Sequence, residues 1–146
     1  MTTLSHNGDT ASSEKSYIEY AIECVKRGFF ILPLKPGEKL PCVKWKDRRD
    51  QKPTEAEVRE WWHRFPDADI GMATGEYSGI DVLDFDSEDA KPHFEYTVSA
   101  LPEGGPTVET GRDGGQHVWF RHTPGLKNLS KPKDPNGNTI DVDVRT

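Results

Sequence analysis

The last third of the sequence most constrains the fold, because it consists of short strand-like runs separated by turn residues. The runs are residues 107–110, 116–122 and 139–145, and clusters of Gly, Pro and Asn divide them. Short strands punctuated in this way are typical of an antiparallel sheet. Helical patterns come earlier in the chain, so we expect an α+β fold in which helices cover one face of a mostly antiparallel sheet.

The first half of the chain predicts two helices and a buried strand. Residues 13–27 carry apolar side chains at helical spacing, and Gly28 follows as a stop signal. The continuous apolar run 29–34 predicts a buried strand. Thr54 and Glu57 form a capping box that opens a second helix over residues 55–65.

The middle of the chain predicts a hairpin followed by a weaker helix. Residues 70–74 and 80–86 are strand-like, and the short turn between them favours direct pairing. Residues 87–100 have helical character, which we expect Pro92 to interrupt.

The length of 146 residues suits one globular domain. We expect a disordered polar tail over residues 1–13 and one folded domain over residues 14–146. No run approaches the roughly 20 apolar residues that span a bilayer, so no membrane partner is expected. Cys24 and Cys42 lack the spacing of a disulfide framework or a zinc module, which favours a cytoplasmic location.

The net charge of −6 hides a local basic cluster. The cluster lies on a single loop, where its positive charges could bind the phosphates along a nucleic-acid backbone. A solvated loop is the simpler explanation. Trp45 in this loop is a candidate for stacking on bases, whereas Trp61 and Trp62 have the spacing of core residues. The cluster comprises Lys35, Lys39, Lys44, Lys46, Arg48 and Arg49.

The run "IDVLDFD" places acids inside an apolar strand. Alternation puts Val82, Asp84 and Asp86 on one face of the strand. Two adjacent carboxylates near a core need a cation, and Mg²⁺ takes carboxylate oxygens while keeping waters for a substrate phosphate. The alternative is an ordinary strand end, where Asp86 begins a turn and Ser87 caps the next helix.

The segment "GRDGGQHVWFR" is a second candidate for chemistry. Gly114 and Gly115 allow close approach of the backbone to a ligand, and their N–H groups suit phosphate oxygens. His117 and Arg121 project to one face of the strand that follows and could donate hydrogen bonds to the same phosphates. The alternative is a plain hairpin with a structural histidine.

The segment "TIDVDVRT" carries a second pair of acids. Asp141, Asp143 and Arg145 share one face of the expected strand, and Ile140 and Val142 lie on the other. Solvent-exposed alternation would explain one such pair. Two acid-bearing strands and a histidine strand in one small domain favour a shared site.

The order of these motifs resembles the N-terminal domain of bifunctional primase-polymerases, in the archaeo-eukaryotic primase superfamily. The segments "KLPCVKW", "DIGMATGEYSGIDVLDFD", "PTVETGRDGGQHVWFR" and "IDVDVRT" carry the resemblance, which extends from about Tyr17 to the C-terminus. It implies an RRM-like catalytic core and, as family members usually continue with a glycine-rich strand, a domain that is incomplete at Thr146. Such proteins belong mostly to phages, plasmids and integrated elements.

The resemblance also assigns roles to residues of this chain. Asp84, Asp86 and Asp143 would be catalytic metal ligands for two Mg²⁺ or Mn²⁺ ions, with Asp141 as the competing third ligand. Gly115 and His117 match the second motif, so His117 would contact the triphosphate of the nucleotide.

The implied activity is template-directed nucleotidyl transfer. The partners would be a single-stranded DNA template, ribo- or deoxyribonucleoside triphosphates and a helicase domain or protein. A metal-dependent phosphohydrolase or nuclease, and a catalytically inactive nucleic-acid-binding module, are the alternatives that share these residues.

Overall fold

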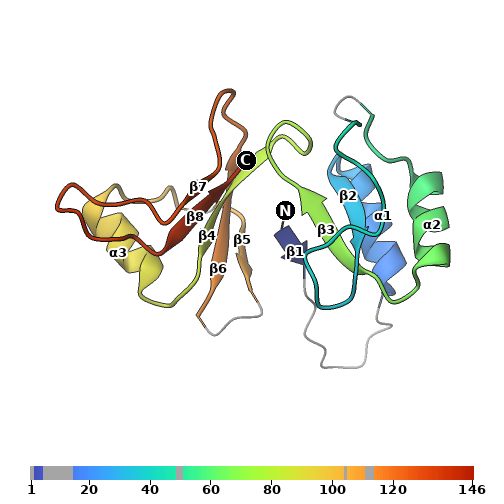
Figure 1. Cartoon of the computed structure of the whole chain (residues 1–146), viewed down its shortest axis with the longest axis horizontal. Coiled ribbons are helices and arrows are strands. Elements are labelled where there is room, and N and C mark those ends of the chain that lie inside the picture. Colours follow the sequence, from blue (N-terminus) through green and yellow to red (C-terminus); the bar gives the residue numbers. More distant parts are fainter. Residues whose placement is uncertain (1, 5–14, 49–50, 104, 111–113) are drawn as a thin grey trace. The chain divides into compact units, whose positions relative to one another are not determined.

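The computed structural model describes residues 2–4, 15–48, 51–103, 105–110 and 114–146. The chain separates into two compact units, residues 1–78 and 79–146. Each unit has its own antiparallel sheet and at least one helix, so the α+β prediction is confirmed (Figure 1). The strands form two sheets instead of the single sheet expected, because each half buries apolar side chains of its own.

Unit 1 is a three-stranded sheet with two helices. Its strands are β1 (Thr2–Leu4), β2 (Phe30–Leu34) and β3 (Asp69–Ala73), and their order is β1-β3-β2. The polar tail predicted over residues 1–13 therefore includes a strand, since Thr2–Leu4 pair with β3. Residues 5–13 lie outside the described residues.

Helix α2 (Glu55–Arg64) of unit 1 begins where its sequence signal predicts, whereas α1 (Tyr17–Lys26) begins four residues after its predicted start at residue 13. Helix α1 starts after a capping box of Ser16 and Glu19. Helix α2 starts after the predicted box, in which the Glu57 amide donates to Thr54 Oγ1 at 3.2 Å. None of the helices in the described part of the chain is long and apolar enough to span a membrane.

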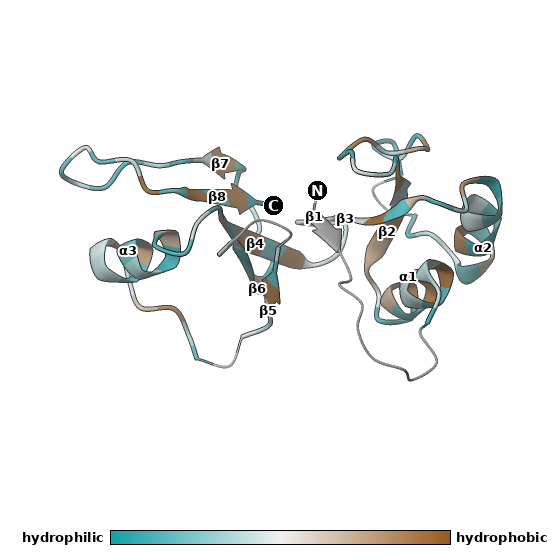
Figure 2. Cartoon of the chain, turned by 90° about the horizontal axis from the view of Figure 1, so that it is seen from below, coloured by the Kyte–Doolittle hydropathy of each residue, from teal (hydrophilic) through white to brown (hydrophobic). Residues whose placement is uncertain are grey.

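Every residue of β2 is buried, which explains its continuous apolar run. Hydrophobic residues are concentrated in strands such as β2 and β4, while α1 and α2 are amphipathic (Figure 2). Trp61 and Trp62 are buried in this unit, as their helical spacing predicts.

Unit 2 is a five-stranded sheet with β4 (Ile80–Phe85) at its centre. The order is β5-β6-β4-β8-β7, and all pairs are antiparallel. The predicted hairpin of residues 70–74 and 80–86 is wrong. Strand β3 uses both edges for β1 and β2, and β4 uses both edges for β6 and β8. The other strands are β5 (Thr107–Glu109), β6 (Gln116–Arg121), β7 (Leu129–Ser130) and β8 (Val142–Arg145).

Helix α3 (Ala90–Thr97) packs on one face of the unit 2 sheet. Phe94 meets Phe85 edge to face, with ring centroids 5.7 Å apart. Pro92 does not interrupt this helix, because it lies in the first turn, where the backbone needs no N–H donor. The buried core of this face comprises Phe85, Ala90, Val118, Ile140 and Val142.

A buried carboxylate ties together the ends of three strands in unit 2. Asp81 accepts hydrogen bonds from His122 Nδ1 at 2.8 Å and from the Thr123 amide at 2.7 Å. Burial raises the pKa of Asp81, but the hydrogen bonds from His122, Thr146 and Thr123 outweigh burial and hold this pKa below its usual range.

We expect acid to remove the stability that Asp81 provides. A carboxyl group with a lowered folded-state pKa stabilises the protein above its unfolded pKa, near pH 4, and this contribution disappears as the pH falls through the folded-state pKa. Thermal melting between pH 2 and pH 7 should therefore show a smaller acid-induced loss for Asp81→Asn than for the parent protein. An unchanged slope would contradict the assignment.

Candidate active site

Three predicted site residues occupy one cross-strand row at the centre of the unit 2 sheet. Asp84 on β4 pairs directly with His117 on β6 and with Asp143 on β8. Side chains of directly opposed residues project to the same face, with Cβ atoms about 4.5 to 5.5 Å apart. All three are buried, with exposed fractions of 9%, 7% and 7%. This row faces away from Phe85 and Val118, so it lies on the face opposite the core beneath α3.

Asp84 is contacted from both neighbouring strands. His117 Nε2 lies 3.1 Å from Asp84 Oδ1, and Arg145 Nη2 lies 3.7 Å from Asp84 Oδ2. The other imidazole nitrogen, His117 Nδ1, is buried and finds no hydrogen-bond partner in the described part of the chain. A buried polar atom of this kind is costly unless a ligand satisfies it.

Asp143 is held by three donors. Ser130 Oγ donates at 2.7 Å and the Lys131 amide at 3.2 Å to Oδ1, while Arg145 Nη2 lies 2.5 Å from Oδ2. Strand β7 therefore fixes one oxygen and an arginine on β8 itself fixes the other. The register places Asp143 opposite Asp84, whereas Asp141 precedes β8.

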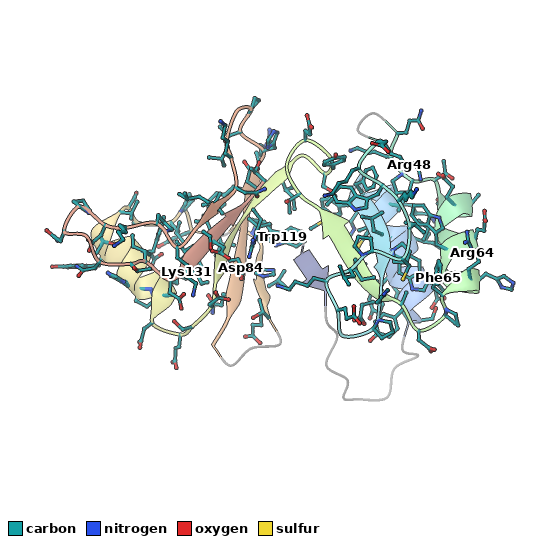
Figure 3. The ribbon with its side chains drawn as sticks, in the orientation of Figure 1. Arg48, Arg64, Phe65, Asp84, Trp119 and Lys131 are labelled. Carbon is teal, nitrogen blue, oxygen red and sulfur yellow. The ribbon has the colours of Figure 1, made fainter. Side chains whose placement is uncertain are left out.

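Asp86 is not part of this row. It follows the end of β4, and Lys131 Nζ lies 3.8 Å from Asp86 Oδ2 and 2.6 Å from Asp141 Oδ1. Figure 3 labels Asp84 and Lys131 among the side chains of this unit. Among the described residues, no three His, Cys, Asp or Glu side chains are grouped closely enough to hold a metal ion. Of the three predicted metal ligands, Asp84 and Asp143 therefore lie in one cross-strand row, and Asp86 lies outside it.

Asp84 and Asp143 nevertheless fit a hard divalent cation. A single atom, Arg145 Nη2, lies within 4 Å of an oxygen of each carboxylate. Mg²⁺ commonly binds proteins through one or two carboxylates and takes its other ligands from water and phosphate. Asp84 and Asp143 would supply the carboxylate oxygens that this requires.

The glycine turn before β6 is only partly described, because residues 111–113 lie outside the described residues. Gly114 adopts φ +72°, and Gly115 is buried. Gly114, Gln116 and Ser87 border a pocket of about 500 Å³ beside α3. The other lining residues are Phe85, Glu88, Lys91, Pro92 and Glu95.

We expect Gly114→Ala to destabilise the protein more than Gly125→Ala. Both glycines have a positive φ, but a Cβ on Gly114 would lie 2.7 Å from the Glu88 backbone nitrogen, and one on Gly125 would meet nothing within 4 Å. The left-handed conformation alone costs about 1 to 2 kcal/mol, so Gly125→Ala measures that cost. Denaturant unfolding of both variants checks the difference, and equal losses would exclude a steric role for the turn.

Arg121 is not brought to the row. It is exposed and pairs with Ile80 at the other end of β6. It lies four positions along the strand from His117, about 13 Å at the usual rise. The arginine that does reach the carboxylates is Arg145, which alternation had placed on the face of Asp143 without assigning it a role. The spacing of two positions between Asp143 and Arg145 is the sequence signal that could have identified Arg145 as a site residue.

The predicted basic loop lies in unit 1, and part of it is engaged there. Trp45 packs against Tyr77 and Phe30, with ring centroids 5.1 and 6.1 Å away. Arg48 pairs with Glu57 at 2.7 Å. Arg49 lies outside the described residues. The lysines of the cluster, Lys35, Lys39, Lys44 and Lys46, are exposed.

The central strand of the unit 2 sheet thus carries an acid between a histidine and a second acid. The family model for the N-terminal domain of bifunctional DNA primase/polymerases matches residues 21–146. The chain belongs to this family, as the order of its motifs predicts. No curated protein matches the sequence closely enough to count as a relative.

Proposed function

We propose that the protein catalyses template-directed nucleotidyl transfer, joining ribo- or deoxyribonucleoside triphosphates on a single-stranded DNA template. The family supports a primase or polymerase function. The observation that carries the proposal is the cross-strand row of His117, Asp84 and Asp143. It joins two buried carboxylates to a buried imidazole whose Nδ1 has no partner in the described part of the chain.

The acidic residues and the histidine have different roles in this proposal. Asp84 and Asp143 would hold Mg²⁺ or Mn²⁺, with Asp86 as a further ligand once Lys131 releases it. Such ions lower the pKa of an attacking hydroxyl group and neutralise a leaving pyrophosphate. His117 would donate from Nδ1 to a phosphate oxygen, while its Nε2 stays beside Asp84 at 3.1 Å. This hydrogen bond orients the triphosphate.

The setting of this activity is part of the same proposal. The protein would act in the cytoplasm in the replication of a phage, plasmid or integrated element. A helicase domain or protein would open the template. The exposed lysines of the unit 1 loop supply positive charge for the template backbone.

Primer synthesis on single-stranded circular DNA tests the proposal. The protein is incubated with Mg²⁺ or Mn²⁺ and with either nucleotide set, and labelled products are separated by length. Template-dependent products that require the metal would support it. Shortening of labelled DNA without extension would identify a nuclease. Binding of DNA without binding of metal or nucleotide in calorimetry would identify an inactive module.

A further inference from the structure

Two cations of the chain itself already lie among the carboxylates of the candidate site. Arg145 Nη2 contacts oxygens of both Asp84 and Asp143. Lys131 Nζ does the same for Asp86 and Asp141. Four acids of the two acid-bearing segments are therefore paired with a cation of the chain itself. Arg145 pairs with Asp84 and Asp143, and Lys131 pairs with Asp86 and Asp141.

The contacts of Arg145 compensate for the burial of Asp84 and Asp143. Two carboxylates that face each other across a strand pair repel, and their burial adds a desolvation cost. Arg145 compensates for both, because alternation on β8 brings its guanidinium back over Asp143 and register brings it beside Asp84. Its side chain is 35% exposed, so it can leave toward solvent, whereas Asp84 and Asp143 cannot.

Lys131 occupies its place at a conformational cost. It is the non-glycine residue with a positive φ, +46°, in the described part of the chain. Its amide binds Asp143 and its ammonium binds Asp141 and Asp86, so a single strained residue contacts three acids. Strain of this kind persists only where surrounding contacts enforce it.

We propose that Arg145 is an internal counter-ion that holds the metal-free site together and competes with the divalent cation for Asp84 and Asp143. Lys131 plays the same part for Asp86. This inference rests on the proposed function for the identity of the competing cation. Arg145 is a positioning residue, and the competition sets how much free metal the site requires.

Removal of Arg145 should therefore tighten metal binding while it weakens the metal-free protein. A charge within 4 to 6 Å changes the affinity of a carboxylate for a proton by one to three powers of ten. Because Arg145 is partly exposed, we expect the low end for a divalent cation, about a tenfold lower Kd for Mn²⁺ in Arg145→Gln. The melting temperature in EDTA should fall, and Mn²⁺ should restore it.

The experiment measures Mn²⁺ binding to the full chain by calorimetry without nucleotide, together with thermal melting in EDTA and in Mn²⁺. Arg145→Lys keeps a cation and should bind Mn²⁺ less tightly than Arg145→Gln. Arg59→Gln, on the exposed face of α2, removes the same charge elsewhere and should match the parent protein. If Arg145→Gln alone is unfolded in EDTA and folds on addition of Mn²⁺, the inference is supported.

Two results would overturn the inference. One is an Mn²⁺ affinity of Arg145→Gln equal to or weaker than that of the parent protein. The other is an equal gain in Arg59→Gln, which would show a general effect of charge. Failure of the proposed function looks different: the primer assay yields no product, or Asp143→Asn binds Mn²⁺ as well as the parent protein does.

Discussion

Asp84→Asn is expected to reduce nucleotide incorporation by about a thousandfold, because a metal ion contributes several kcal/mol of transition-state stabilisation and each 1.36 kcal/mol is a factor of ten. Asparagine keeps the shape of the side chain but loses the charge that attracts a divalent cation. Single-turnover extension of a labelled primer measures the loss.

The fold should survive this change. Arg145 keeps its contact with Asp143 in the variant, at a distance of 2.5 Å in the parent protein. The melting temperature should shift by no more than about 5 °C, the effect of roughly 1 kcal/mol on a domain of this size. Inactivity caused by unfolding would therefore be recognised.

Asp141→Asn is the matched control for this prediction. Asp141 lies two residues from Asp143, its side chain is 38% exposed, and its partner is Lys131. We expect it to retain incorporation within about threefold of the parent rate, as surface substitutions usually have small effects. Normal incorporation by Asp84→Asn, or a greater loss in Asp141→Asn, would show that the register does not identify the catalytic acids.

His117→Ala is expected to raise the KM for the nucleotide by about ten- to a hundredfold, the equivalent of one hydrogen bond to a charged group of roughly 1.5 to 3 kcal/mol. The affinity for the template should change much less, because the proposed partner of Nδ1 is a phosphate of the nucleotide. Steady-state extension at varied nucleotide concentration, together with DNA binding by fluorescence anisotropy, separates the two effects.

Two polar substitutions identify which nitrogen matters. Asparagine places an amide near the position of Nδ1, and glutamine places one near Nε2, which contacts Asp84. If Nδ1 holds the phosphate, His117→Asn should retain more nucleotide affinity than His117→Gln. His63→Ala, on the exposed side of α2, should leave both affinities unchanged. Equal losses of nucleotide and template affinity in His117→Ala would contradict the assignment.

Local sequence signals predicted the elements well where a strong physical rule applies. The capping box of Thr54 and Glu57 fixed the start of α2, and the apolar run of β2 predicted full burial. Strands β1 and β7 were missed, because such short strands depend on a neighbouring edge more than on their own composition. The predicted hairpin of residues 70–74 and 80–86 is wrong for the same reason, since the local sequence does not determine which neighbouring strand each edge pairs with.

The candidate site was predictable in its members but not in its pairing. Alternation along β8 grouped Asp143 with Arg145, and the two side chains are in contact. Asp86 follows the end of β4, so its grouping with Asp84 stays a prediction. Only the register decides that Asp84 and Asp143 are neighbours, and that Asp86 faces Lys131 instead. The role of Lys131 could not be predicted, because a left-handed lysine in a connecting segment has no sequence signature.

The position of β4 between β6 and β8 also determines when the site forms during folding. Pairing of β4 with β6 closes a shorter loop than pairing with β8, so the β8 ladder carries the larger entropic cost and we expect it to form later. During synthesis, Asp84 and His117 can meet before Asp143 has left the ribosome. A nascent chain would therefore present one carboxylate beside an imidazole, and under the proposed function it would offer Mg²⁺ both Asp84 and Asp143 only once β8 has docked.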